Sequence, residues 1–371
     1  MALHVDLREG GGMKMAPLVD RMTRPSSGNA LAMTVLGILS VAMMVASVMT
    51  GASAASVVGV LRALMLDVVP GDASMLLRDQ VVVLEIRLPR AVLGFLTGAA
   101  LAVSGAVMQG LFRNPLADPG VVGVSSGASL GAVSCIIFGP TLLAPFMAAF
   151  GMFALPLAAF AGGLVVTFVL YKIASSDGET QIGTLLIAGI AVSALAMALA
   201  GLLIYMADDR QLRDITFWSL GSLAGSTWQK AGIAALVIVP ALSVIPFLGR
   251  GLNAFTLGEA AAFHMGVPVE RFKRIAILLV AAATGVSVAF SGGIVFVGII
   301  VPHLIRLTVG PDHRLLLPAS VLLGGSLLLA ADMIARTIVA PAELPIGILT
   351  ALIGSPFFLW ILFKGRSGRI M

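Results

Sequence analysis

Charged residues are scarce in this sequence. They make up 11% of its 371 residues, against about 25% in an average soluble protein, whereas 59% of the residues are hydrophobic. A water-soluble chain of this length could not cover its surface with so few polar side chains. The composition therefore excludes a soluble enzyme, and it excludes a disordered chain as well.

Cysteine is scarcer still, because Cys135 is the only one and cannot form an internal disulfide. We expect it to be a small core residue in a helix. The 42 glycines follow no period of three, which excludes a collagen-like chain. The formal net charge is +5, but the basic residues lie between apolar runs. We therefore expect no nucleic-acid partner and interpret these residues as signals of membrane orientation.

Long runs without any charged side chain dominate the chain. Gly139-Pro140 and Pro145 divide the longest run into two helices, and Ser291-Gly292-Gly293 divides 275–305 into one full helix and one short, irregular helix. Since one crossing takes about 20 residues, the sequence predicts an all-α integral membrane protein with about ten transmembrane helices per subunit. The charge-free runs are 25–61, 91–112, 119–171, 180–207, 231–249, 275–305, 315–331 and 344–363.

Lysine and arginine predict the orientation of these helices. Most of the 23 basic residues fall in the tails and in alternate connections, so the positive-inside rule places both termini in the cytoplasm. We expect residues 1–29 to form a disordered cytoplasmic tail and residues 30–365 to form a single transmembrane domain. Residues 366–371 then form a second cytoplasmic tail.

The sequence lacks the residues that several functions would require. No lysine follows a glycine, so the chain has no phosphate-binding loop for ATP, and another subunit must supply any ATP hydrolysis. Acidic residues within the apolar runs are nearly absent apart from Asp332, which argues against a proton- or sodium-coupled transporter and against a membrane-embedded enzyme. The histidines lie in the tail or toward the cytoplasmic side, so we assign no metal ligand and no permanently bound cofactor. They are His4, His264, His303 and His313.

Three arginines lie at the outer ends of predicted spans. Arg87 and Arg90 open the second span, three residues apart on one helix face, and Arg336 ends the ninth. We expect these side chains to face the water-exposed rim, where they either anchor the helices in the interface or attract an acidic partner. An ion pair with Asp332, four residues before it, is a second interpretation of Arg336.

The most informative connection is 250–274, between the sixth and seventh spans. Gly266 ends one short helix there, and Pro268 begins a second. The few charges around Ala260, Phe263 and Met265 suit either a helix lying on the bilayer or one seated in a groove of another protein.

Taken together, these segments resemble the permease family of ATP-driven importers for iron-siderophores, haem and vitamin B12, the FecCD type. The similar stretches occur in family order and cover residues ~30–365. They are Arg87-Leu88-Pro89-Arg90, 98–109, Asn114-Pro115-Leu116-Ala117-Asp118-Pro119-Gly120, Leu257-Gly258-Glu259, Pro302-His303-Leu304-Ile305-Arg306, Asp312-His313-Arg314 and Glu343-Leu344-Pro345-Ile346-Gly347.

The resemblance implies a ten-helix fold like that of the vitamin B12 permeases, in the bacterial inner membrane. It implies a homodimer, two separate ATP-binding cassette subunits that bind the ATP, and a periplasmic binding protein. Arg87, Arg90 and Arg336 would meet acidic residues of the binding protein, in preference to interfacial anchoring. The coupling helices at about 257–274 would contact the ATPase through Leu257, Gly258, Glu259, Ala260, Phe263, Met265 and Gly266.

The transported substrate follows from two segments. Residues 112–127 and 218–223 are most similar to the haem permeases, although siderophore permeases share much of the pattern. We therefore expect a permease that moves haem from a periplasmic haem-binding protein into the cytoplasm, with ferric siderophores and then corrinoids as alternatives.

Overall fold

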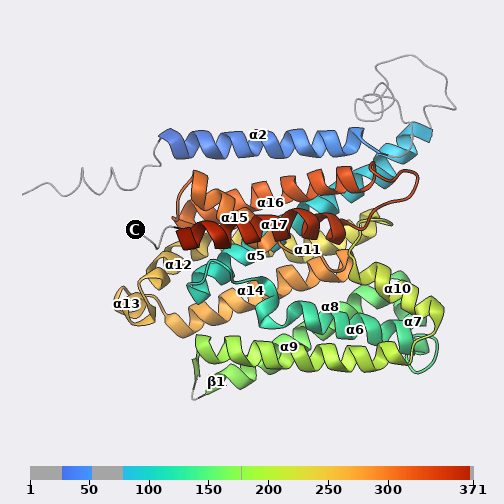
Figure 1. Cartoon of the computed structure of the whole chain (residues 1–371), viewed down its shortest axis with the longest axis horizontal. Coiled ribbons are helices and arrows are strands. Elements are labelled where there is room, and N and C mark those ends of the chain that lie inside the picture. The colour runs from blue at the N-terminus through green and yellow to red at the C-terminus, as the bar shows by residue number, and fades with distance from the viewer. Residues whose placement is uncertain (1–26, 52–77, 177, 368–371) are drawn as a thin grey trace, which may run out of the picture.

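The computed structural model describes residues 27–51, 78–176 and 178–367, and it is a bundle of helices (Figure 1). A short antiparallel pair of strands, β1 (Ser175–Ser176) and β2 (Glu179–Thr180), joins two of the helices. The helical elements in chain order are α2 (Ser27–Met49), the π-helical turn η1 (Val82–Arg87), α5 (Leu88–Phe112), η2 (Pro119–Val122), α6 (Val124–Phe138), α7 (Ala144–Phe150), η3 (Gly151–Phe153), α8 (Ala154–Ala174), α9 (Ile182–Tyr205), α10 (Asp209–Ser219), α11 (Trp228–Val244), η4 (Ile245–Leu248), α12 (Gly249–Thr256), α13 (Glu259–His264), α14 (Val269–Ser291), α15 (Val297–Thr308), α16 (His313–Ala335) and α17 (Ile346–Ser367).

Helix length and composition agree with the predicted spans. Within the described residues, seven helices are long and apolar enough to cross a membrane, and three more apolar helices are shorter: α6, α15 and the apolar part of α17. The predicted break near Gly139-Pro140 is confirmed, because α6 and α8 are separate helices with the small α7 between them. The predicted division of 275–305 into a full and a short helix is confirmed by α14 and α15.

Helix ends follow local sequence signals. Asp208 caps α10 by accepting a hydrogen bond from the Gln211 amide, and Thr227 and Asp312 cap α11 and α16 in the same way. Helix α5 has a proline in its first turn and ends at Phe112, and its C-cap residue Arg113 has a left-handed backbone (φ 51°, ψ 35°). That conformation is uncommon for a residue other than glycine, and the following Asn-Pro segment turns the chain away from the helix axis.

Helix α5 is the centre of the bundle. In its most apolar stretch 89% of the residues are buried, against 17% for α9 at the periphery. Gly98 faces the Gly324 backbone of α16, and Gly105 faces the Gly298 backbone of α15, so closely that a Cβ atom on either glycine would overlap with main-chain atoms. Small residues of this kind let helices in a membrane approach to backbone contact.

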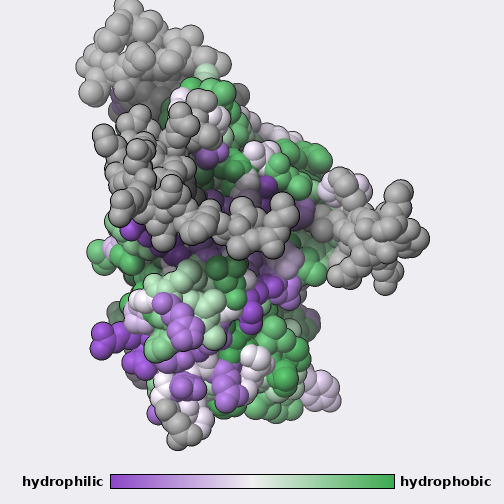
Figure 2. All heavy atoms as spheres, turned by 90° about the vertical axis from the view of Figure 1, so that its left-hand side faces the viewer, coloured by the Kyte–Doolittle hydropathy of each residue, from purple (hydrophilic) through white to green (hydrophobic). Residues whose placement is uncertain are grey.

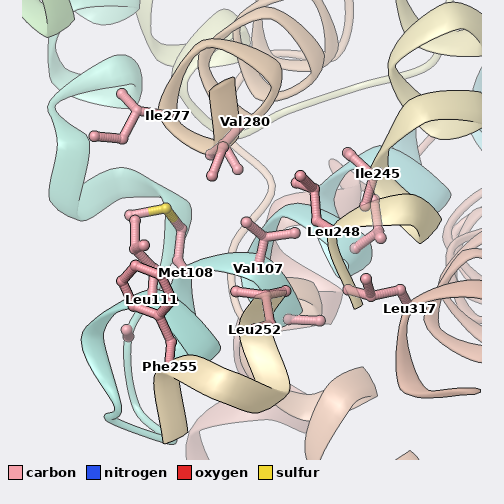
Figure 3. Close-up of a cluster of buried hydrophobic side chains, with 14 of the residues drawn as sticks. Val107, Met108, Leu111, Ile245, Leu248, Leu252, Phe255, Ile277, Val280 and Leu317 are labelled. Atoms are coloured by element: carbon pink, nitrogen blue, oxygen red, sulfur yellow. The ribbon is translucent and has the colours of Figure 1, made fainter. Parts of the chain in front are cut away.

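One end of the bundle carries α12 and α13, and we call it the α13 end (Figure 1). The opposite end carries α7 and α10, and we call it the α10 end. Figure 3 shows Leu252 and Phe255 of α12 packed toward Val107, Met108 and Leu111 of α5. Ile277 and Val280 of α14, Leu317 of α16, and Ile245 and Leu248 of η4 belong to the same hydrophobic cluster. The cluster therefore connects the α13 end to the central helix.

The connection between the sixth and seventh spans is shorter than expected. The sequence predicts it at 250–274, but α12 follows η4 directly, and α14 begins at Val269 as a continuous helix. The charged residues among 270–274 thus lie in the first turns of a long helix rather than in a loop. The predicted tail 1–29 lies almost wholly outside the described residues, and α17 continues to Ser367, so the tail boundaries stay a prediction.

Candidate functional site

A group of buried charges lies at the α10 end, where α5 begins and α16 ends. Arg90 forms two ion pairs, with Nη2 at 2.8 Å from Asp332 Oδ1 and Nη1 at 2.8 Å from Glu343 Oε1. Its Nε also donates to Asp332, and Nη2 donates to Glu343 Oε2 at 3.0 Å. A planar guanidinium is suited to such forked contacts with two carboxylates. Arg90 therefore joins α5 to α16 and to the segment before α17.

The other two arginines extend this group to α2. Arg336 Nη2 donates to the backbone oxygen of Ser47 at 2.7 Å and to its hydroxyl at 2.9 Å. Arg87 Nη1 donates to the last carbonyls of α2, at Val48 and Met49. We call Arg87, Arg90, Asp332, Arg336 and Glu343 the arginine cluster.

The expectation that these arginines face a water-exposed rim is wrong. Arg87 and Arg336 are 3% exposed and Arg90 is 8% exposed, because carboxylates and helix-end carbonyls from other elements surround them. The alternative ion pair of Arg336 with Asp332 is present, with Nε 3.5 Å from Oδ2. A docking role for the three arginines stays a prediction.

At the α13 end, a compact turn presents apolar side chains outward. Gly258 and Gly266 bracket α13 with φ of 109° and 84°, values that favour glycine. Ala262 is buried against the bundle, whereas Phe263 and Met265 are 66% and 53% exposed. Figure 2 views this end and shows hydrophilic residues gathered on it beside hydrophobic patches. The remaining predicted coupling residues, Leu257, Gly258, Glu259, Ala260 and Gly266, lie in the same turn and are exposed or half-buried.

A buried lysine holds this turn in place. Lys273 on α14 is 2% exposed, and its Nζ donates to Glu259 Oε2 at 2.9 Å, to Glu270 Oε1 and to the backbone oxygen of Thr180. The second oxygen of Glu270 accepts from the Thr180 amide at 2.8 Å. We call these four residues the lysine cluster. It joins α13, α14 and strand β2.

The sequence alone does not reveal the lysine cluster. Its pattern predicts an ATPase contact for Glu259 and only a cytoplasmic charge for Lys273. The spacing of Glu270 and Lys273, three residues apart, is the one local signal of an ion pair. Thr180 lies 93 residues before Lys273 in the sequence, so only the folded chain brings the two together.

An aromatic pair connects the same turn to the core. Phe255 of α12 stacks on Phe272 of α14, with ring centroids 5.0 Å apart and an interplanar angle of 25°. Phe255 also packs toward α5 (Figure 3). The lysine cluster therefore connects α13 to α14, and Phe255 connects α12 to α14 and α5.

Metal-binding groups do not assemble in the part of the chain that the structure describes. Its His, Cys, Asp and Glu side chains form no group of three that could hold a metal ion. His264 lies exposed on α13, and His303 and His313 lie on α15 and at the start of α16.

Comparison with known proteins supports a transport role. Residues 36–364 match the FecCD transport family. The chain is 46% identical over 286 residues to a hemin transport system permease protein of Yersinia pestis, covering 77% of this chain and 84% of that protein. It is also 46% identical over 292 residues to a cobalamin import system permease protein of Halobacterium salinarum, covering 79% and 76%.

Two further similarities agree with these. A vitamin B12 import system permease protein of Escherichia coli is 40% identical over 289 residues, covering 78% of this chain and 86% of that protein. A solved structure of a metal-chelate type ABC transporter in an inward-facing conformation superposes with a TM-score of 0.76 at 33% identity, covering 90% and 98% of the two chains. With a family match over most of its length and apolar helices throughout, this chain belongs to the FecCD transport family, as a multi-pass permease subunit of an ABC importer in the inner membrane.

Proposed function

We propose that this permease moves haem from a periplasmic binding protein into the cytoplasm. The observation that carries the proposal is the 46% identity to a hemin permease, together with the haem-permease-like segments 112–127 and 218–223. An equal identity to a cobalamin permease makes a corrinoid importer the first alternative. The pattern shared with siderophore permeases makes a ferric siderophore importer the second.

The working assembly that we propose contains two copies of this chain, two ATP-binding cassette subunits and one periplasmic haem-binding protein, within membrane lipid. ATP is bound and hydrolysed by the cassette subunits. Haem is the transported substrate and not a resident cofactor. Both termini of the permease lie in the cytoplasm, so the α13 end faces the ATPase and the α10 end faces the periplasm.

Coupling occurs at the α13 end. The exposed Phe263 and Met265 of α13 are suited to a groove on the cassette subunit. When ATP closes the cassette dimer, the turn moves, and Lys273 and Phe255 carry that movement to α14 and α5. ATP shifts the equilibrium between inward- and outward-open states only through its different affinity for the two.

The binding protein docks at the α10 end, and Arg90 exchanges one of its carboxylate partners when it does. Arg90 already binds two carboxylates, of which Asp332 is fully buried and Glu343 has a side chain 35% exposed. An acidic side chain of the binding protein would displace Glu343 while Asp332 stays in place. Charge complementarity of this kind orients a partner and speeds its association.

The test is the ATPase activity of the reconstituted complex with its binding protein empty or loaded with haem, with cobalamin or with a ferric siderophore. Strong stimulation by the haem-loaded form alone, with haem entering the vesicles, is the expected result. Stimulation only by another loaded form would move the substrate to that alternative and leave the importer standing. A complex that no loaded form stimulates would contradict delivery by a binding protein.

A further inference from the structure

A small basic cavity opens at the α13 end, beside the turn that carries α13. It has a volume of about 260 Å³ and lies between the end of α5, the end of α12, α15 and the start of α16. Its polar lining comes from Gln109, Arg113, Asn114, Thr256, Arg306 and His313. No acidic side chain is among the described residues that line it.

In the described part of the chain, neither arginine of the cavity forms an ion pair with a carboxylate. Arg306 is half-buried, and its Nη1 donates to Gln109 Oε1, while Gln109 Nε2 is held by the carbonyl of Gly298 at 3.0 Å. The acid nearest to Arg306 in sequence, Asp312, accepts instead from Asn253 and from the amide of Arg314. The acid nearest to Arg113, Asp118, accepts from the amide of Gly120. The guanidinium groups of Arg113 and Arg306 thus border a polar space whose lining holds no opposite charge. Arg113 also lines the neighbouring cavity, together with Glu259 and Glu270.

The backbone at the end of α5 brings Arg113 to this place. Arg113 is the left-handed C-cap of the helix (φ 51°), and the turn that it makes places Asn114 and Pro115 in the cavity lining as well. Arg306 is oriented by a neutral amide, which fixes its direction and leaves its charge free for an anion. Guanidinium groups with planar, forked donors are the usual partners of phosphate in proteins.

The position of the cavity indicates where its anion comes from. It lies where α5 ends at Phe112, α15 ends at Thr308 and α16 begins at His313, so three membrane helices end at its level. The ends of apolar helices mark the headgroup region of a bilayer, and basic pockets between such ends bind anionic lipid headgroups. We propose that Arg113 and Arg306 bind a phosphate group in this cavity, and that the phosphate is the headgroup of an anionic membrane lipid.

The proposal depends on the membrane position of the chain and not on which substrate it carries. It is tested on the purified permease–ATPase complex, by thermal unfolding during titration with phosphatidylglycerol or cardiolipin, with phosphatidylcholine, or with inorganic phosphate. We expect the anionic lipids to raise the unfolding midpoint and phosphatidylcholine to leave it unchanged. In the variant R113Q/R306Q the affinity for anionic lipid should fall at least tenfold.

A matched control removes the same charge from the same end. Arg250 and Arg314 are exposed and do not line the cavity, so R250Q/R314Q should retain the lipid response. The proposed site would be refuted if both double variants lost the same affinity for anionic lipid. It would also be refuted if anionic lipid raised the unfolding midpoints of wild type and R113Q/R306Q equally. Stabilisation by inorganic phosphate but not by lipid would keep the site and reject the lipid as its source. If R113Q/R306Q does not assemble, R113Q alone serves, because the Arg113 side chain is exposed.

Discussion

At the scale of single residues, the two charge clusters differ in how much they tolerate the loss of a member. In the lysine cluster the carboxylates of Glu259 and Glu270 are about one-third exposed, so water can compensate for part of a lost contact. In the arginine cluster Asp332 is fully buried. A buried carboxylate without its cation has no such compensation.

Replacing Lys273 by Met should lower the free energy of unfolding by about 1–3 kcal/mol, because the Thr180 carbonyl and two carboxylates lose their donor. If the lysine positions α13, the variant also transports fewer substrate molecules per ATP hydrolysed. The ratio of uptake to hydrolysis in proteoliposomes measures this, and K273R should recover most of it. A K273M complex with a normal ratio would restrict Lys273 to a stabilising role.

Replacing Arg90 by Gln should destabilise the chain by about 3–5 kcal/mol, since Asp332 is left buried without its main cation. Replacing Glu343 by Gln should cost much less and should tighten binding-protein affinity about tenfold, or about 1.4 kcal/mol, by removing the internal competitor for Arg90. Surface plasmon resonance on the complex in nanodiscs measures this affinity. Weaker binding of E343Q than of wild type would contradict the exchange of partners.

At the scale of helices, close backbone contact determines which glycines can be replaced by alanine without loss of stability. A Cβ atom on Gly105 of α5 would overlap with the Gly298 carbonyl, whereas one on Gly37 of α2 would meet nothing within 4 Å. The two glycines therefore provide a matched pair, because both lie in apolar helices and only Gly105 is at a close helix–helix contact.

Replacing Gly105 by Ala should lower the unfolding midpoint, through an overpacking cost of about 1–3 kcal/mol. Replacing Gly37 by Ala should leave the midpoint unchanged or raise it slightly, since alanine favours a helix by about 0.5–1 kcal/mol. Thermal unfolding of both variants in one detergent makes the comparison. Similar midpoints for the two would show that α5 and α15 can separate at this contact.

The positions of the helices are largely predictable from the sequence, whereas their buried contacts are not. Apolar runs and the break at Gly139-Pro140 locate the helices, because both signals are local. The predicted helix start at Pro268 is confirmed by α14. The predicted extent of the connection to residue 274 is wrong, because Lys273 lies within the helix and is neutralised there by Glu259 and Glu270. The burial of Arg90 depends on partners 242 and 253 residues away, and no local pattern contains that information.

At the scale of the whole molecule, the two ends of the bundle have different surfaces. The described part of the α13 end exposes Phe263 and Met265 on a turn fixed to the core, whereas the α10 end keeps its arginine cluster inside. The exposed pair at the α13 end is thus available for contact with a partner, whereas the arginine cluster must exchange an internal partner before it can bind another protein.

The variant F263E/M265E should lose copurification with the ATPase subunit while keeping the wild-type unfolding midpoint, because both side chains are exposed. A similarly exposed aromatic residue at the other end, Phe217, is the control, and F217E should copurify normally. Retention of the ATPase by F263E/M265E at wild-type stoichiometry would refute the assignment of α13 as the coupling element.

The glycine contacts of α5 also restrict how the transporter can change shape. Helices that touch through interlocking side chains can slide past one another by small rotamer adjustments. At Gly98 with Gly324, and at Gly105 with Gly298, main chain meets main chain, and no rotamers are available to absorb a shift. Helices α5, α15 and α16 should thus behave as one rigid block through the transport cycle. Any movement that reaches α5 should therefore carry α15 and α16 with it.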